Sequence, residues 1–196
     1  MAFNDFDMVL VGIGDEFNKN EDALAAYNLL AEGLEGKNYF IVSLCMDDKI
    51  YESNLNEERI VSPLGGKRKK QCPNGCDNLL FNPSETECPI CHEELVDNNI
   101  LAERYVEEGY LPMWEKHKKW LIGTLNKRLL VLELGTSMKF PEIIRFPFEK
   151  IAFLNDKAKF LRVNNGIYQL SSDVSGKGQG IKDDSVKWII ENINSL

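Results

Sequence analysis

Two cysteine pairs separated by a short polar stretch constrain this chain more than any other feature of its sequence. Cys72 and Cys76 are followed, after eleven residues, by Cys88 and Cys91. Four thiolates at this spacing are a typical tetrahedral ligand set for Zn²⁺, and because protein fills all four positions, the predicted site is structural rather than catalytic. The surrounding stretch is poor in apolar residues, so metal binding rather than burial is expected to fold it.

The remaining candidate metal ligands and thiols, His92 and Cys45, allow more than one interpretation. His92 follows the last cysteine and could replace one ligand, although four cysteines make this unnecessary. Redox thiols or accidental clustering are the alternatives to a metal site. The fifth cysteine, Cys45, stands apart from the pairs. We favour a small buried hydrophobe there over a reactive thiol, because no basic neighbour is evident to lower its pKa.

The net charge and the hydropathy of the chain argue against a nucleic-acid-binding, secreted or membrane-spanning protein. The formal net charge of -8 over 196 residues argues against nucleic acid as a partner, because the phosphate backbone requires a basic surface. The residues before the first apolar run are acidic, unlike a signal peptide, and no apolar run approaches the roughly 20 residues of a membrane helix. We therefore expect a cytoplasmic protein with reduced thiols and no membrane or nucleic-acid partner.

Continuous apolar runs predict the strands of a parallel sheet that is buried on both faces. They span residues 8–13, 39–44, 129–134 and 159–163, and a weaker fifth spans 167–170. Apolar residues recur at helical spacing over 23–34, 114–125 and 186–193. The alternation predicts an α/β fold, a Rossmann-like parallel sheet with helices on both faces.

Two local features modify this pattern. A helix after the third strand is expected to begin near Pro141 and to be cut short by Pro147. Residues 66–98 are polar, rich in Pro, Asn and Cys, and lack an apolar period. We interpret 66–98 as an inserted zinc-binding module in a domain formed by residues 1–65 and 99–196.

The first strand is followed by a candidate phosphate-binding turn. Gly12 and Gly14 precede a helix, a position suited to a pyrophosphate at a helix N-terminus. However, Phe17 stands where a third glycine would complete the dinucleotide motif, and Asp15 and Glu16 place negative charge where phosphates would lie. A plain tight turn is an equal alternative.

Small polar residues end the next two strands. Gly135, Thr136 and Ser137 follow the third strand, and Asn164 follows the fourth. Open α/β sheets bind ligands at the carboxyl ends of their strands, and hydroxyl and amide side chains suit ribose hydroxyls. The same side chains equally suit turns and helix caps.

These pieces, in this order, resemble the sirtuin family of NAD-dependent protein deacylases and ADP-ribosyltransferases. Residues 132–141, LELGTSMKFP, are similar to the family's G-T-S-L-x-V-x-P motif, and the four cysteines stand where sirtuins carry structural zinc. Residues 57–72 and 141–149 look closer to a bacterial branch, the macrodomain-linked sirtuins associated with ADP-ribosylation. The resemblance implies structural zinc and an NAD site that includes Gly12, Gly14, Asp47, Gly135, Thr136, Ser137 and Asn164.

The departures from the family pattern concern catalysis. Leu64, in Pro63-Leu64-Gly65, occupies the place of the catalytic histidine, and leucine has no titratable atom to act as a general base. Asp47 is kept from the T-Q-N-x-D segment, but Cys45 replaces the asparagine that helps to bind nicotinamide. The family's cofactor loop, with its G-I-P-D-F-R signature, is absent.

These departures favour a catalytically degenerate sirtuin-like protein, one that keeps fold and zinc and binds NAD, ADP-ribose or a protein partner. The alternative is an active, divergent NAD-dependent ADP-ribosyltransferase or deacylase that modifies an acceptor protein. A zinc-ribbon protein that works purely through protein contacts is a third hypothesis, since a fold alone does not assign an activity.

Overall fold

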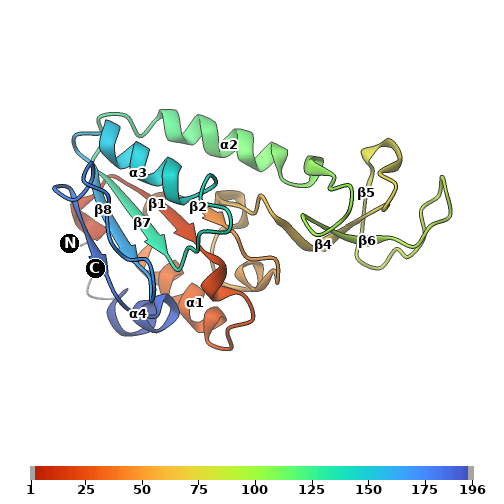
Figure 1. Ribbon diagram of the computed structural model, residues 1–196, viewed down its shortest axis with the longest axis horizontal. Coiled ribbons are helices and arrows are strands. Elements are labelled where there is room, and N and C mark those ends of the chain that lie inside the picture. Colours follow the sequence, from red (N-terminus) through yellow and green to blue (C-terminus); the bar gives the residue numbers. More distant parts are fainter. Residues whose placement is uncertain (1–2, 194–196) are drawn as a thin grey trace.

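A parallel sheet forms the body of the computed structural model, which describes residues 3–193. Its strands are β1 (Met8–Ile13), β2 (Asn38–Ser43), β3 (Ile60–Val61), β7 (Leu129–Leu134), β8 (Lys159–Val163) and β9 (Gly178–Ile181). Within the described residues the sheet has six strands in the order β3-β2-β1-β7-β8-β9, and every neighbouring pair is parallel (Figure 1).

The apolar runs explain the inner strands. β1, β7 and β8 begin and end where the sequence predicts, and β2 begins and ends one residue earlier than predicted. Every residue of β1 and β7 is buried, as expected for strands covered on both faces. The prediction of a strand over residues 167–170 is wrong. The carbonyls of Ile167 and Gln169 accept hydrogen bonds from Arg145 and Arg162, and the edge strand is β9 instead.

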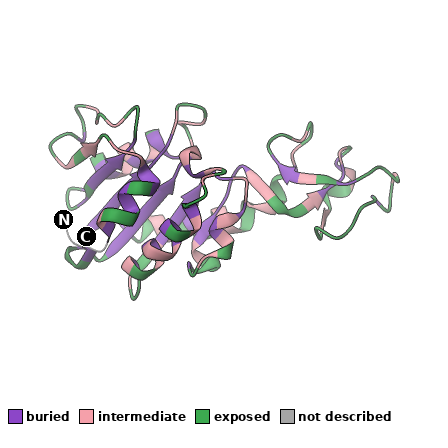
Figure 2. Ribbon diagram, turned by 90° about the horizontal axis from the view of Figure 1, so that it is seen from below, coloured by how far each residue is buried: buried purple, intermediate pink, exposed green. Residues whose placement is uncertain are grey.

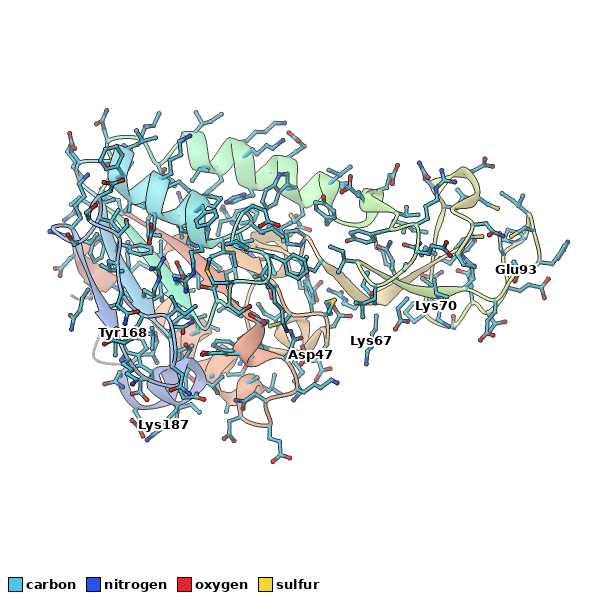
Figure 3. The ribbon with its side chains drawn as sticks, in the orientation of Figure 1. Asp47, Lys67, Lys70, Glu93, Tyr168 and Lys187 are labelled. Atoms are coloured by element: carbon cyan, nitrogen blue, oxygen red, sulfur yellow. The ribbon has the colours of Figure 1, made fainter. Side chains whose placement is uncertain are left out.

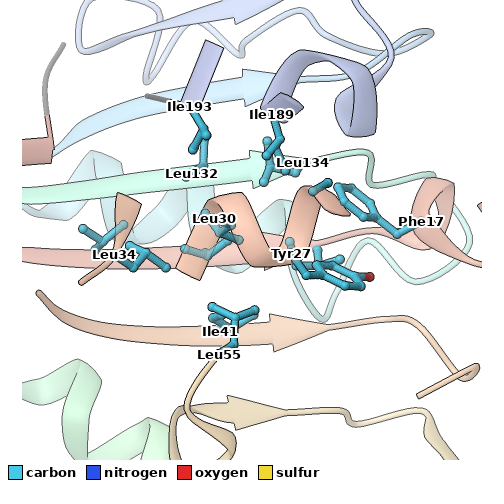
Figure 4. Close-up of a cluster of buried hydrophobic side chains, with 14 of the residues drawn as sticks. Phe17, Tyr27, Leu30, Leu34, Ile41, Leu55, Leu132, Leu134, Ile189 and Ile193 are labelled. Atoms are coloured by element: carbon cyan, nitrogen blue, oxygen red, sulfur yellow. The ribbon is translucent and has the colours of Figure 1, made fainter. Parts of the chain in front are cut away.

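Helices cover both faces of the sheet, which confirms the predicted fold class. They are α1 (Ala23–Gly33), α2 (Leu111–Ile122), α3 (Arg145–Leu154) and α4 (Ser185–Asn192). α1 and α4 pack on one face, and α2 and α3 pack on the other (Figure 1). Tyr27 and Leu30 of α1 meet Ile189 of α4 and Leu132 of the sheet in one apolar cluster (Figure 4).

Two expectations about helix limits are wrong. α3 begins at Arg145, so Pro147 lies in its first turn, where a backbone N–H has no acceptor within the helix and a proline is tolerated. The carbonyl of Pro141 accepts from the N–H of Phe146 at 2.9 Å, in the turn that precedes the helix. α2 ends at Ile122, and Leu125 lies beyond it, exposed.

A second, smaller sheet carries the cysteines. β5 (Leu80–Phe81), β4 (Gly65–Gln71) and β6 (Val96–Asn99) form an antiparallel sheet in that order. It projects from the body beside the edge of the large sheet (Figure 1), and much of its ribbon is exposed, whereas the strands of the body are buried (Figure 2). Short 3-10 helices complete the described chain: Phe3–Asp5, Asp15–Phe17, Lys49–Glu52, Glu57–Arg59, Cys76–Asn78 and Glu107–Gly109. Within residues 3–193 no helix is both long and apolar enough to cross a bilayer.

Candidate functional site: a zinc centre and the switch-point loops

The four predicted ligands lie together in the turns that adjoin the strands of the smaller sheet. The sulfur atoms of Cys72, Cys76, Cys88 and Cys91 all lie within 4.8 Å of one another. Tetrahedral zinc with bonds of about 2.3 Å separates its thiolates by about 3.8 Å, so the cluster is consistent with a structural zinc ion. His92 is outside this cluster and instead hydrogen-bonds through Nδ1 to Glu87 at 2.6 Å.

Backbone and side-chain donors favour the thiolate at one of the four cysteines, Cys91, whereas hydrogen bonds with Cys91 and Cys72 raise the pKa of Cys76. The N–H of Glu93 and the neighbouring Cys72 thiol lower the pKa of Cys91 to about 6. Asn74 Nδ2 also donates to Cys91 Sγ at 3.6 Å. Such donors stabilise the thiolate, which is the form that binds zinc. Gly75 has a φ of +64°, and its N–H donates to the carbonyl of Cys72 at 2.9 Å, so the turn between the first two ligands requires glycine.

The second candidate site is at the carboxyl ends of β1 and β7. Chain connections run in opposite directions from these neighbours, which makes this position the topological switch point, where open α/β sheets bind ligands. We call residues 14–17, 135–137 and 164–167 the switch-point loops. Gly14 donates to the carbonyl of Leu134 at 2.7 Å, and a Cβ on Gly14 would lie only 2.0 Å from the carbonyl oxygen of Gly135. The close contact of the two backbones excludes a side chain at Gly14.

Gly12 has a different role. It lies inside β1, and a Cβ there would lie 2.5 Å from Ile144 Cγ2 and 2.7 Å from Phe148 Cε2. The structure therefore uses Gly12 to let α3 pack closely on the sheet. Gly135, by contrast, is in the loop itself with a φ of +63°, beside the side chain of Glu16.

Asp15 accepts hydrogen bonds from the polar groups of the loop after β7. Its two carboxylate oxygens accept from the N–H and from the hydroxyl of Ser137, both at 3.0 Å, and Lys139 Nζ lies 3.3 Å away. Burial alone would raise the pKa of Asp15, but the bonds from Ser137 outweigh burial and lower that pKa. The donors that could hold an anionic ligand therefore already hold an anion of the protein.

Glu16 fills the neighbouring position. Ser185 Oγ, at the start of α4, donates to Glu16 Oε2 at 3.0 Å. Partial burial raises the pKa of Glu16. Asp15 and Glu16 thus place two carboxylates at the switch point, as the sequence predicted.

Thr136 and Asn164 connect two of the loops. The carbonyl of Thr136 accepts from Asn164 Nδ2 at 2.8 Å and from Arg145 Nη2 at 3.0 Å. Asn164 Oδ1 accepts from the N–H groups of Gly166 and Ile167 at 2.9 and 2.7 Å. The amide of Asn164 therefore holds the two loops in register.

A buried charge network beneath these loops was missed at the sequence level. Arg162 binds Glu133 through Nε and Nη2, each at 2.8 Å, and Glu149 also lies 2.8 Å from Nη2. Arg145 lies 3.3 Å from Glu133, and the hydroxyl of Thr136 donates to the same carboxylate. The sequence did contain an indication of this network. Glu133 and Arg162 are charged residues inside apolar strands, where a buried charge needs a partner of opposite sign.

The remaining predicted residues lie on the β2 side. Asp47 Oδ2 accepts from the N–H of Lys19 at 2.9 Å, and the residue lies near the base of the zinc-bearing sheet (Figure 3). Cys45 is buried and donates to the carbonyl of Gly14 at 3.3 Å. Burial raises the pKa of the Cys45 thiol to about 12, so this cysteine is a packing residue rather than a reactive thiol.

A general base is missing from the predicted position. Leu64 is 2% exposed and belongs to the apolar core. The two histidines of the chain lie elsewhere. His117 is buried in α2, where burial lowers its pKa to about 4, and His92 is exposed near the zinc ligands.

Comparisons with known proteins agree with this geometry. No protein-family model matches the chain. A curated relative from Staphylococcus aureus (strain Mu50 / ATCC 700699), named "Protein ADP-ribosyltransferase", is 21% identical over 180 residues, which cover 81% of this chain. The match spans 57% of that relative's length.

Solved structures match nearly the whole chain. A mutant Sir2 homologue in complex with ADP ribose superposes with a TM-score of 0.63 at 10% identity, covering 97% of this chain and 92% of that one. A Sir2 homolog–NAD complex superposes with a TM-score of 0.61 at 11% identity, covering 97% and 89%. A third Sir2 enzyme structure gives 0.57 at 13% identity, covering 97% and 94%. The chain therefore has a sirtuin-like fold, the fold of the Sir2 homologues.

Proposed function

We propose that this chain binds NAD or ADP-ribose at the switch-point loops, carries a structural zinc ion, and does not catalyse deacylation. One observation carries the proposal: the side chain at the position of the family's base is Leu64, buried in the core. Deacylation needs a group that removes a proton from a ribose hydroxyl. Neither histidine belongs to the switch-point loops, which supports a chain without a histidine base for this step.

The donor set supports an anionic, ribose-containing ligand. Ser137 presents an N–H and a hydroxyl to a carboxylate that a ligand oxygen can replace. Fold neighbours were solved with NAD and with ADP ribose. When bound, NAD supplies a labile bond between ribose and nicotinamide, and the residues here would hold and orient it. We further propose a cytoplasmic location and a protein partner or acceptor, since reduced thiols suit the zinc site.

Calorimetric titration of the zinc-loaded chain with NAD and with ADP-ribose tests binding, and a nicotinamide-release assay with an acyl-lysine peptide tests catalysis. We expect saturable binding without nicotinamide release. Ser137→Ala should weaken binding, whereas the exposed Ser172→Ala should not. Turnover of the peptide would refute the inactive assignment, and the absence of binding by either ligand would refute the nucleotide site.

The curated relative favours a second candidate, protein ADP-ribosyltransferase. In that reaction the ribose–nicotinamide bond breaks, nicotinamide leaves, and a nucleophile of an acceptor protein loses a proton and bonds to the ribose. Asp47 is the carboxylate among the residues of the predicted NAD site, and it lies near the base of the zinc-bearing sheet (Figure 3). Labelled NAD incubated with the chain and an acceptor protein separates the candidates, because incorporated label that Asp47→Asn abolishes would establish the transferase.

A further inference from the structure

A cavity of about 320 Å³ lies away from the switch-point loops, where three parts of the chain meet. Edge strand β3 and the segments on either side of it contribute Tyr51, Val61 and Ser62 to the wall. The zinc-bearing sheet contributes Gly66 and Arg68, and the start of α2 contributes Met113. This volume is within the range of small-molecule sites.

Asp48 is the buried carboxylate of the cavity wall. Its backbone is left-handed, with a φ of 62°. One oxygen, Oδ2, accepts from two backbone N–H groups, those of Lys67 and of Arg68, the latter at 2.9 Å. Among residues 3–193, no group donates a hydrogen bond to the other oxygen, Oδ1. A Cβ on Gly66 would lie 2.1 Å from Oδ1, so glycine at that position makes room for the carboxylate.

The fold does not require a charge at Asp48. Asparagine adopts the left-handed conformation readily, and its single carbonyl oxygen could accept both backbone bonds. Burial raises the pKa of Asp48, which means that the negative charge is disfavoured in the cavity without a ligand. The two backbone hydrogen bonds therefore explain Oδ2 but give no structural reason for Oδ1 or for the negative charge.

Among the other charges around the cavity, Arg68, Glu57 and Glu58 form ion pairs, and Lys69 is the exception. Arg68 binds Glu57 at 2.8 Å and lies 4.3 Å above the ring of Tyr51. Glu58 pairs with Lys116. Lys69 is exposed. Within the described chain, Asp48 forms no ion pair with a side-chain cation, so it is the carboxylate of the wall that remains available to a cationic ligand.

We propose that this cavity binds a small organic cation with a primary ammonium group. The ammonium would donate to Asp48 Oδ1, and the apolar part of the ligand would contact Met113 and the ring of Tyr110, which also lines the cavity. A carboxylate oxygen that accepts no hydrogen bond from the protein can accept a charge-assisted hydrogen bond from an ammonium, which is stronger than a bond between neutral groups. None of the lining residues belongs to the switch-point loops, although Asp48 directly follows Asp47 of the predicted NAD site.

The test uses n-pentylamine, which is protonated at neutral pH, and the neutral 1-pentanol as its matched control. Amide NMR spectra of the ¹⁵N-labelled, zinc-loaded full chain report binding. We expect pentylamine to shift the amides of Gly65, Gly66 and Arg68 saturably, and 1-pentanol to leave them unchanged. Asp48→Asn should lower the affinity for pentylamine at least tenfold, whereas Asp156→Asn, on the exposed surface, should not.

The proposal would be overturned by the absence of a saturable shift, by equal shifts with 1-pentanol, or by unchanged affinity in a folded Asp48→Asn variant. Shifts spread over all acidic surfaces would also overturn it, since they indicate nonspecific attraction. If Asp48→Asn does not fold, Met113→Trp tests the same site from its apolar end. Filling the cavity should abolish the shifts, and retained binding in that variant would contradict the proposed location.

Discussion

Glu133 and Arg162 stand opposite each other on β7 and β8 and form a two-point ion pair that is sealed from water, with both contacts at 2.8 Å. The pair lies directly before the switch-point loops, and Thr136 and Arg145 bind to the same carboxylate. A buried ion pair need not stabilise a fold more than apolar residues would, but the loss of one partner leaves an unpaired charge. The pair therefore fixes the geometry of the loops.

The first prediction concerns this pair. Glu133→Gln should lower the free energy of unfolding by about 3–5 kcal/mol, because two buried cations would lose a carboxylate partner. Arg162 would keep only its contact with Glu149, and Arg145 would lose the carboxylate that lies 3.3 Å away. Urea denaturation measures the change. Glu191→Gln is the matched control, since Glu191 pairs with Lys187 at 3.8 Å on the exposed face of α4, and should cost less than about 1 kcal/mol. Similar losses in both variants would show that the buried pair has no special role.

Zinc removal tests the predicted division of the chain. A chelator, or Cys88→Ser, should abolish hydrogen-exchange protection over residues 66–98 and leave β1 and β7 protected, because the smaller sheet has few apolar contacts of its own. Cys45→Ser should retain one zinc ion per chain. A metal-free chain with residues 66–98 still protected would contradict the structural role of the metal.

The third prediction applies if the nucleotide site is correct. Glu16 places a negative charge beside the loops, and burial raises its pKa. Protonation of Glu16 removes that charge, so the affinity for ADP-ribose should increase as the pH falls toward the pKa of this carboxyl. Glu16→Gln should strengthen binding at neutral pH by about 1 kcal/mol, roughly fivefold, and should flatten the pH dependence. Calorimetry at several pH values decides, and weaker binding by the variant would contradict the expected repulsion.

His117 is expected to make the free energy of unfolding depend on pH. It lies between Phe40 and Trp114, with both ring centroids 5.2 Å away, and neither ring nitrogen has a partner within the described residues. Burial lowers its folded-state pKa to about 4 from 6.5. The unfolded chain therefore binds a proton first, and stability should fall as the pH drops from 6.5 toward 4, by up to about 3 kcal/mol.

Urea denaturation at several pH values, followed by tryptophan fluorescence, measures this loss. His117→Leu should remove most of the dependence, because leucine does not titrate and suits an apolar site. His92→Ala, which changes the exposed histidine, should retain it. An identical pH profile in His117→Leu and the unmodified chain would assign the effect to other groups.

The glycine at the end of β1 gives a steric prediction. Gly14→Ala should be strongly destabilising, because the new Cβ would meet the backbone of Gly135 at 2.0 Å. Gly176→Ala has no atom within 4 Å of the new Cβ, so its cost should be small. Thermal unfolding without any ligand compares the two. Equal melting temperatures would show that the loops move apart easily.

Continuous apolar runs made the inner strands predictable, because a strand buried on both faces needs an apolar side chain at nearly every position. Edge strand β9 carried no such signal. Gly178 and Gly180 occupy it because their Cβ atoms would lie 2.0 Å from the carbonyls of Phe160 and Tyr168. Close backbone packing of this kind depends on the assembled sheet, which a local pattern does not reveal.

The candidate site was predictable to a similar degree. Strand ends placed Gly14, Ser137 and Asn164 at one edge of the sheet, as parallel topology requires. The sequence also located negative charge at Asp15. It did not reveal that Asp15 would bind Ser137, since 122 residues separate them and the contact requires the folded sheet. The four cysteines were the clearest signal, because their spacing alone defines a ligand set.

The contact between Asp15 and Ser137 has a consequence for selectivity. Asp15 is attached to the same fold as its donors, so it competes with dissolved anions at an effective concentration in roughly the millimolar range or above. Chloride or inorganic phosphate, each offering one weak point of attachment, would rarely displace it. A larger ligand that contacts several loops at once could displace it. The carboxylate of Asp15 would therefore select against small anions and in favour of extended ligands that bind at several points.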